Sequence, residues 1–273
     1  MRNKASTNGF IRAYNIARLA GLVDLPTFHR VFLFSYFLYK RWYEDPFSVL
    51  VKRHPEMFAQ GNILDVGANV GYTACLFATA CKVPAKVYAF EPDRANFATL
   101  AQVLGRKKVA DSVEIFRMAV GSADGMLEFW HNVEHAGDHR VVTAQFKSSD
   151  LDHTKITTVP VTSIDNFVLA HDLRNVSFIK IDVQGYELAV CEGMQHTLER
   201  FPSLSIACEY APDGMQELGF EPAALLHFFR SAGYQLHTLT RRSIQLATDD
   251  REIDAAAKGS GYVDLLCSRK TLN

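Results

Sequence analysis

The sequence has no excess of charge of either sign, because 29 lysines and arginines stand against 30 acidic residues, for a formal net charge of −1. A balance this close to neutral gives no electrostatic reason to expect a nucleic acid as a partner. The five cysteines, at positions 75, 81, 191, 208 and 267, are odd in number and form no Cys-x-x-Cys pair. This pattern favours reduced thiols in the core of a cytoplasmic protein.

Long apolar stretches are also missing. No stretch is long enough to span a bilayer, and no apolar segment with a cleavage site follows the basic start Arg2-Asn3-Lys4, so we expect no signal peptide. We found no internal repeat and no low-complexity segment. The content of 48% apolar and 22% charged residues is typical of a soluble globular chain, and 273 residues fit one large domain with an added segment.

The added segment is rich in aromatic residues. The range Gly9–Gln60 is predicted to be helical, and nine aromatic residues lie between Phe28 and Phe47. We therefore divide the chain into a helical extension over 1–60 and a main domain over 61–273. The favoured interpretation is a helix packed on the main domain. A homodimer contact, a cover over a substrate pocket, and a peripheral contact at the inner face of a membrane remain alternatives.

The main domain alternates strands with helices, which predicts a mostly parallel sheet covered on both faces. Strands are expected at Asn62–Val66, Lys86–Glu91, Val113–Met118, Ser177–Asp182 and Leu204–Glu209. Helices are expected at Gly71–Cys81, Arg94–Leu104, Ile164–Ala170, Gly185–Glu199 and Pro222–Ala232. Two further strands, Met126–Trp130 and Lys155–Pro160, flank a polar loop that is rich in histidine. The strands Tyr234–Thr240 and Tyr262–Ser268 are expected to close the sheet as an antiparallel hairpin.

The run Asp65-Val-Gly-Ala-Asn-Val-Gly71 is the most informative feature of the chain. It joins an expected strand to an expected helix, an arrangement that presents backbone N–H groups and a helix N-terminus to a ligand. Asn69 stands where a dinucleotide-binding turn has the glycine that lets the backbone approach a pyrophosphate. The turn therefore disfavours NAD and FAD and suits a nucleoside without a pyrophosphate, such as S-adenosylmethionine (SAM). A structural turn without a ligand is the alternative.

Two acidic residues follow other strands of the predicted sheet. Glu91 comes 26 residues after Asp65, at a strand end where a carboxylate can accept hydrogen bonds from both ribose hydroxyls. Asp182 ends a strongly apolar strand, so it is expected in the same crevice, with a helix N-cap as the structural alternative. Asn96 and Ala119 fall where an adenine pocket would be lined, although ordinary helix and strand-end roles fit them equally well.

Five motifs in this order resemble the FkbM family of SAM-dependent methyltransferases: DVGANVGY at 65–72, AFEP at 89–92, MAVG at 118–121, GDHR at 137–140 and IKIDVQGYE at 179–187. The resemblance covers about Gly61–Pro212. It implies the Rossmann-like class I methyltransferase fold, with a seven-stranded, mostly parallel sheet containing one antiparallel strand. It also implies SAM as cofactor and methylation of a hydroxyl on a sugar, a glycolipid or a macrolide-type natural product.

By position, the resemblance assigns the cofactor site to Asp65, Gly67, Asn69, Gly71, Glu91 and Asp182. We add Ala68, Tyr72, Pro92, Asn96 and Ala119 as further candidates for cofactor binding. One departure stands out: the family commonly has Asp-Val-Glu-Gly where this chain has Asp182-Val-Gln184-Gly. Any scheme that needs two adjacent acids on this turn is weakened by that change.

Methyl transfer to a hydroxyl calls for a positioned base, and His139, Asp182 and Glu209 are the candidates. We favour His139, with Asp182 as its orienting partner or as the alternative base, because the segment from His131 to Arg140 can fold over an acceptor as a lid. Plain surface histidines are the alternative, above all for His135. Asp182 and Glu209 could together hold a divalent ion, but Tyr210 follows Glu209 where an Asp-Asn pair would be needed, so no metal is expected.

Two other functions compete with O-methylation. The same fold can methylate nitrogen on a small molecule or a protein. Alternatively, the chain is a SAM- or nucleoside-binding module without catalysis, with the aromatic N-terminal zone as its interaction surface. Intact Gly67, Gly71, Glu91 and Asp182 argue against loss of the cofactor site. The expected partner is a small-molecule or glycan acceptor.

Overall fold

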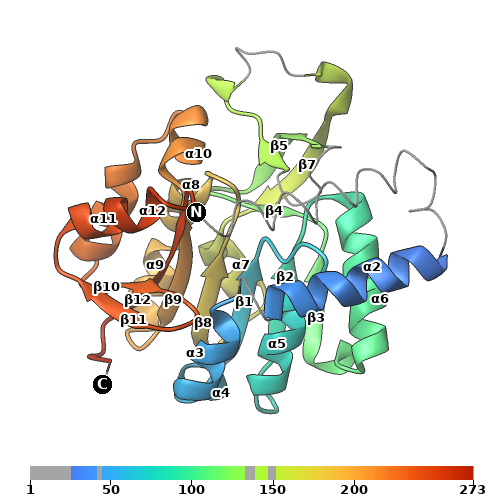
Figure 1. Ribbon diagram of the computed structural model, residues 1–273, viewed down its shortest axis with the longest axis horizontal. Coiled ribbons are helices and arrows are strands. Elements are labelled where there is room, and N and C mark those ends of the chain that lie inside the picture. The colour runs from blue at the N-terminus through green and yellow to red at the C-terminus, as the bar shows by residue number, and fades with distance from the viewer. Residues whose placement is uncertain (1–25, 42–44, 133–138, 147–151, 273) are drawn as a thin grey trace.

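A central eight-stranded sheet organises the structure (Figure 1), a computed structural model that describes residues 26–41, 45–132, 139–146 and 152–272. The strand order is β11-β10-β12-β9-β8-β1-β2-β3. The strands are β1 (Asn62–Val66), β2 (Val87–Phe90), β3 (Val113–Phe116), β8 (Val176–Ile181), β9 (Ser205–Tyr210), β10 (Gln235–Leu239), β11 (Ile244–Ala247) and β12 (Val263–Ser268). His135 and the Gly137-Asp138 half of the GDHR motif lie outside the described residues.

Five neighbouring strands run parallel, from β9 through β8, β1 and β2 to β3. Strand β12 is antiparallel to both of its neighbours, β9 and β10. Strand β12 is the antiparallel strand implied by the class I methyltransferase resemblance, and the edge strand β11, antiparallel to β10, is a second one. The carboxyl ends of β1, β2, β8 and β9 therefore meet at one edge, where ligands bind in open α/β sheets.

Helices cover both faces of the sheet because successive side chains along each strand point to opposite sides. Ile63 and Phe178 pack beneath the helices of one face, whereas Leu64 and Ile179 pack beneath those of the other. The first face carries α2 (Pro26–Tyr39), α3 (Phe47–Arg53), α4 (Glu56–Ala59), α5 (Tyr72–Ala80) and α6 (Arg94–Lys107). The second carries α7 (Ile164–Ala170), α8 (Glu187–Glu192), α9 (Gln195–Arg200), α10 (Pro212–Glu217), α11 (Pro222–Ser231) and α12 (Asp250–Ala257).

A second sheet of four short strands stands above the main sheet in Figure 1. Its order is β4 (Ala119–Val120), β7 (Ile156–Thr162), β5 (Gly125–Trp130) and β6 (Arg140–Val141). It has a small core of its own, formed by Ala119, Phe129, Val141, Val159 and Val161. The two strands expected on either side of the histidine-rich loop are thus confirmed as β5 and β7.

The strand count expected from the resemblance is wrong by one. Strand β11 adds an eighth strand at the edge, and β11 and α12 separate β10 from β12 along the chain. The expected antiparallel pairing of β10 with β12 is confirmed, but the hairpin partner of β10 is β11. Two polar residues, Arg242 and Ser243, precede this four-residue strand, which made it easy to take for a loop.

The helix expected over Gly185–Glu199 is two helices, α8 and α9. The break falls at Gly193, where an added Cβ would lie 2.2 Å from the carbonyl oxygen of Gly121. This close approach of two backbones requires a residue without a side chain. The glycine ends α8, and α9 starts again at Gln195.

The described part of the N-terminal extension is helical, as expected. On α2, Leu33 is buried in the core of the first face, while Val31, Phe34 and Leu38 are exposed. The interpretation of a helix packed on the main domain is confirmed for this segment, and the division of the chain at residue 60 stays a prediction. None of the described helices is both long and apolar enough to cross a bilayer.

Candidate active site

The glycine turn follows β1 and is pressed against the ends of two neighbouring strands. Gly67, Asn69 and Gly71 all have left-handed backbone conformations, with φ of 79°, 49° and 90°. A Cβ on Gly67 would lie 1.9 Å from the carbonyl oxygen of Asp182, so only glycine fits there. The N–H groups of Gly67 and Ala68 both donate to the carbonyl oxygen of Phe90. The turn is therefore fixed to β2 on one side and to β8 on the other.

Glu91 faces this turn from the end of β2. Its side chain is buried, with one oxygen accepting the N–H of Asn69 at 2.9 Å and the other accepting the N–H of Asp93 at 2.9 Å. Burial raises the pKa of Glu91 to about 8, helped by the nearby Asp93 carboxylate and opposed by the two N–H groups. The structure thus brings the predicted ribose-binding acid into contact with the predicted glycine turn.

Asn96 lies buried in the first turn of α6, where its N–H donates to the capping carboxylate of Asp93. Ala119 belongs to β4 of the second sheet, and its side chain is part of that sheet's small core. The side chain of Ala119 therefore packs in the core of the second sheet, whereas the sequence had suggested a position lining an adenine pocket. Pro92 lies between Glu91 and Asp93, at the start of the loop that enters α6.

Lys180 lies beneath the glycine turn as a fully buried cation. Its Nζ donates to the carbonyl oxygen of Gly67 at 2.8 Å, and it lies 3.2 Å from Asp182 Oδ2 and 3.6 Å from Asp65 Oδ1. The other oxygen of Asp65 accepts the hydroxyl of Thr73 at 2.7 Å. Burial raises the pKa of Asp65 against the opposing charge of Lys180. Asp65 and Lys180 together fix the position of the turn. Lys180 was not predicted as a site residue, although a single charged residue in the apolar strand Phe178–Ile181 could have indicated it.

Gln184 bridges two carboxylates at the ends of β8 and β9. Its side-chain amide lies 3.0 Å from Asp182 Oδ1 and 3.4 Å from Glu209 Oε2. A carboxylate only accepts hydrogen bonds, so the NH₂ group of the amide must face both acids. Gln184 has a φ of 56°, a left-handed conformation that is uncommon for a residue other than glycine. Such outliers concentrate at functional sites.

The pKa values of the neighbouring residues Asp182 and Glu209 are shifted in opposite directions. Burial raises the pKa of Glu209 well above its ordinary value, and the carboxylates of Asp182, Glu187 and Asp264 raise it further. Burial acts in the same direction on Asp182, but the charges of Lys180 and Lys40 and two hydrogen bonds outweigh it and lower its pKa. Asp182 is therefore ionised at neutral pH, and Glu209 is the more basic group.

Two further acids surround this pair. Glu187 accepts the N–H groups of Val183 and Gly185 at 3.0 and 3.1 Å, which holds the turn after β8, and burial raises its pKa to about 7. Asp264 lies directly opposite Glu209 in the β9–β12 ladder, and burial raises its pKa to about 7 as well. Because α8 begins at Glu187 with Tyr186 as its N-cap, the alternative of Asp182 as a helix cap is wrong.

The N-terminal extension reaches the same crevice. Tyr72, the first residue of α5, donates its hydroxyl to Asp45 Oδ2 at 2.8 Å, and its ring meets Phe37 of α2 with centroids 5.3 Å apart. The carboxylate of Asp45 also accepts the N–H groups of Phe47 and Ser48, where α3 begins. The charge of Lys40, just after α2, acts on both Asp182 and Asp264. The extension therefore forms one border of the site.

His139 lies on the other side of Glu91, next to Asp93 and His131. Its Nδ1 accepts the N–H of Asn132 at 3.0 Å, and its Nε2 lies 3.8 Å from Asp93 Oδ2. The carboxylate beside His139 is thus that of Asp93, whereas we had expected Asp182. No role was predicted for Asp93, and His131 was placed only at the start of a possible lid. Their contact joins residues 38 positions apart in the chain, so no local pattern could have revealed it.

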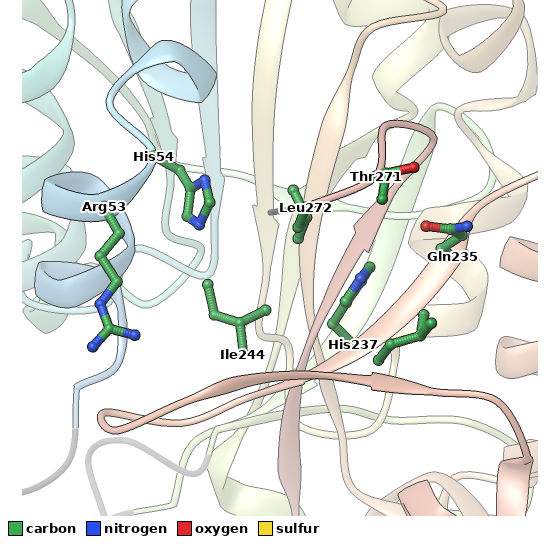
Figure 2. A pocket seen from close by; sticks show the side chains of 8 residues that line it. Arg53, His54, Gln235, His237, Ile244, Thr271 and Leu272 are labelled. Carbon is green, nitrogen blue, oxygen red and sulfur yellow. The ribbon is translucent and has the colours of Figure 1, made fainter.

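A cavity of about 460 Å³ lies elsewhere, near the start of β10 (Figure 2). Its lining comes from the end of α3, from β10 and β11, and from the last residues of the chain: Arg53, His54, Gln235, His237, Ile244, Leu246, Thr271 and Leu272. Every residue predicted for the cofactor or for catalysis is absent from this lining. The cavity is separate from the edge where β1, β2, β8 and β9 end.

Comparison with known proteins shows which protein family the chain belongs to. Residues 65–236, more than half of the chain, match the Methyltransferase FkbM domain. The chain belongs to the FkbM methyltransferase family. The match starts at Asp65 of the glycine turn and includes Glu91, Asp182 and Glu209. FkbM proteins are methyltransferases, and SAM is the cofactor that membership implies.

One curated relative is the hexuronic acid methyltransferase AglP of Haloferax volcanii, with 29% identity over 136 residues. The match covers half of this chain and half of that relative. Among solved structures, a methyltransferase FkbM from Methylobacillus flagellatus KT aligns over 77% of this chain and 44% of its own, with 16% identity and a TM-score of 0.47. The O-methyltransferase TomG of Streptomyces achromogenes, solved with SAM, aligns over 82% and 79%, with 11% identity and a TM-score of 0.45.

The residues of this FkbM-family chain fit a nucleoside cofactor. The left-handed turn at Gly67, Asn69 and Gly71 leads directly into the N-terminus of α5, the kind of place where backbone N–H groups bind a ligand. Glu91 is a buried carboxylate at the end of the adjacent strand, as ribose recognition requires. A sulfonium carries positive charge, and the ionised carboxylate of Asp182 lies at the end of the strand next to the turn.

Proposed function

We propose that this chain transfers the methyl group of SAM to a hydroxyl of a sugar, with a hexuronic acid or its derivative as the favoured acceptor. The observation that carries the proposal is the pair of carboxylates, Asp182 and Glu209, that Gln184 bridges beside the glycine turn. The hexuronic acid methyltransferase of Haloferax volcanii supports the choice of a sugar acceptor.

SAM, when bound, supplies an electrophilic methyl group. The chain must then hold the donor and the acceptor hydroxyl in line, which accounts for much of the catalysis of such a displacement. In this proposal Glu91 accepts the ribose hydroxyls, and the turn from Gly67 to Gly71 carries the rest of the nucleoside. Lys180 keeps the turn and Asp182 in fixed relative positions through contacts of 2.8 and 3.2 Å.

Glu209 is the proposed general base. The acceptor's O–H bond breaks toward Glu209 while the new C–O bond forms and the C–S bond of the donor breaks, leaving S-adenosylhomocysteine. A base works best when its pKa is close to the working pH, and burial raises the pKa of Glu209 in that direction. Asp182 is a weaker base because the charge of Lys180 lowers its pKa, and we assign it to positioning through Gln184.

His139 was the base favoured by the sequence, and the geometry favours Glu209 over it. Both ring nitrogens of His139 face groups of the protein, the N–H of Asn132 and the carboxylate of Asp93. A nitrogen that already accepts a backbone N–H has no lone pair left for an acceptor's proton. Comparison of the turnover of Glu209→Gln with that of His139→Ala distinguishes these two bases.

Lys40 supports an acidic acceptor. Its positive charge is felt by Asp182 and Asp264, so it acts at the border of the crevice where the acceptor would lie. A hexuronate carries a carboxylate that a neutral hexose lacks, and a lysine near the site would favour it electrostatically. Lys40→Gln should therefore reduce the preference for hexuronate over hexose, whereas Lys52→Gln, on the exposed side of α3, should leave it unchanged.

The test is the rate of S-adenosylhomocysteine formation with three acceptors: an activated hexuronic acid, the matching neutral hexose and a primary amine. We expect turnover with the hexuronic acid above the hexose, and none with the amine. Glu209→Gln should lose at least about a hundredfold in kcat, within the usual contribution of a general base. His139→Ala should retain most of its turnover. A large loss in His139→Ala with full activity in Glu209→Gln would reverse the assignment of the base.

A further inference from the structure

Three potential metal ligands converge beside the glycine turn, at a place where the sequence analysis expected no metal. One ligand atom from each of Asp93, His131 and His139 lies within 4.8 Å of the other two. His131 Nδ1 is 2.7 Å and His139 Nε2 is 3.8 Å from the same atom, Asp93 Oδ2. Two imidazoles and a carboxylate form one of the common donor sets for Zn²⁺ in proteins.

The separations suit a small tetrahedral ion. Ligands about 2.0–2.1 Å from a zinc ion at tetrahedral angles lie roughly 3.3 Å apart. The two distances to Asp93, 2.7 and 3.8 Å, fall on either side of that value, and all three ligand atoms lie within 4.8 Å of one another. Their side chains are only 8%, 22% and 11% exposed, which removes most of the competing water.

The groups around the ligands hold two of them in place. Asp93 Oδ1 accepts the N–H groups of Ala95 and Asn96 at the start of α6, which leaves Oδ2 turned toward the histidines. His131 Nε2 lies 2.6 Å from the hydroxyl of Thr157. Without an ion, His131 Nδ1 donates its proton to the carboxylate of Asp93 at 2.7 Å, and Nε2 accepts the hydroxyl of Thr157. On metal binding the proton moves to Nε2 and is donated to Thr157, which leaves the Nδ1 lone pair for the ion. Such outer contacts fix the ring orientation and tautomer of metal-binding histidines.

His139 must also change its tautomer on binding. Its Nδ1 accepts the N–H of Asn132, which places its proton on Nε2, toward Asp93. Coordination through Nε2 moves the proton to Nδ1 and breaks the bond to Asn132. A single net hydrogen bond is much weaker than the binding of zinc to a three-ligand protein site, so the ion wins this competition.

We propose that Asp93, His131 and His139 bind a divalent transition-metal ion, with Zn²⁺ the best fit. The ion would fasten both ends of the segment between β5 and β6 to the first turn of α6, two residues beyond Glu91. Its role is to fix the wall of the cofactor crevice, and three protein ligands leave a fourth position for water. The site shares no residue with the base proposed for methyl transfer, so either proposal can fail without the other.

The experiment uses the full chain, stripped with a chelator and titrated with Zn²⁺ by calorimetry and with Co²⁺ by visible absorption. We expect one ion per chain, and Co²⁺ bands of tetrahedral intensity. Asp93→Asn, which keeps an oxygen for the cap of α6, and His139→Ala should each weaken Zn²⁺ binding by at least about tenfold. His153→Ala removes an exposed histidine next to β7 and is the matched control, with unchanged binding.

Circular dichroism of each variant confirms that it is folded, and Glu209→Gln should bind Zn²⁺ as the unchanged protein does. Three results would overturn the proposal. The first is the absence of stoichiometric binding at micromolar Zn²⁺. The second is unchanged affinity in His139→Ala. The third is equal loss in His153→Ala, which would point to scattered surface histidines.

Discussion

The side-chain amide of Gln184 donates a hydrogen bond of 3.0 Å to the carboxylate of Asp182, and the backbone of Gln184 itself is in the left-handed region. The same amide nitrogen reaches toward Glu209. FkbM proteins commonly have glutamate where this chain has Gln184, and a glutamate would bring a third carboxylate to a place where the structure has a hydrogen-bond donor. The glutamine therefore keeps two acids close together without adding a charge.

Replacing Gln184 by glutamate should move the activity of the enzyme to higher pH. The new carboxylate would raise the pKa of Glu209, which burial and its neighbours already raise. A like charge at this distance shifts a pKa by about 1 unit or more, so the acidic limb of log kcat/KM should move by that amount. Gln195→Glu, on an exposed residue of α9, is the control. An unchanged pH profile in Gln184→Glu would show that Glu209 does not titrate in catalysis.

Gly67→Ala should abolish SAM binding. The added Cβ would overlap the carbonyl oxygen of Asp182 at 1.9 Å, and a left-handed conformation costs a residue with a side chain about 1–2 kcal/mol in addition. Gly105→Ala, inside α6 with open space around it, is the matched control and should bind SAM normally. Calorimetric titration of both variants with SAM measures the difference. Normal binding by Gly67→Ala would mean that the turn does not form the cofactor site.

Much of this site could be predicted from the sequence because its parts are local. The turn from Asp65 to Gly71 joins a strand directly to a helix, and Glu91 follows the next strand, so position along a parallel sheet was enough to bring them together. Asp182 and Glu209 were placed at the same edge by the same rule. Strand β11 was missed because it has only four residues, Ile244–Ala247, and is flanked by polar residues on both sides.

The contacts that stabilise the site could not be predicted, because they join distant parts of the chain. Lys180 donates to Gly67 across 113 positions, and Tyr72 reaches Asp45 across 27. A sequence pattern gives the face on which a side chain lies but not its partner. The choice of His139 as base rested on its typical pKa and on a segment that could fold over an acceptor, whereas its partners turned out to be Asp93 and Asn132.

Tyr72→Phe should loosen the attachment of the extension. The lost hydroxyl donates to buried Asp45, and such a bond contributes about 0.5–1.5 kcal/mol to the free energy of unfolding. For a chain of this size the melting temperature should fall by roughly 2–4 °C per kcal/mol. Tyr234→Phe is the control, because among the described residues the buried Tyr234 hydroxyl has no hydrogen-bond partner, so its removal should not destabilise. Equal melting temperatures for Tyr72→Phe and the unchanged protein would show that the bond between Tyr72 and Asp45 does not help to attach the extension.

The ligand-free protein should lose stability as the pH rises from about 5 to about 8.5. Burial raises the pKa of Glu91 to about 8 and those of Glu187 and Asp264 to about 7. A raised folded-state pKa stabilises the fold below the unfolded value of about 4.5, and this contribution disappears as the pH passes the folded value. Thermal melts across this range measure the trend, and Glu91→Gln should flatten its upper part. A melting temperature that rises from pH 6 to 8 would contradict these shifts.

The central claim, methyl transfer to a sugar oxygen, is tested most directly with SAM labelled with ¹³C in its methyl group. The labelled donor is incubated with an activated hexuronic acid, and the product is observed by carbon NMR. We predict an O-methyl resonance on the sugar, formed by the unchanged protein and not by Glu209→Gln. A label found on nitrogen, or no label transferred by protein that binds SAM, would contradict the account.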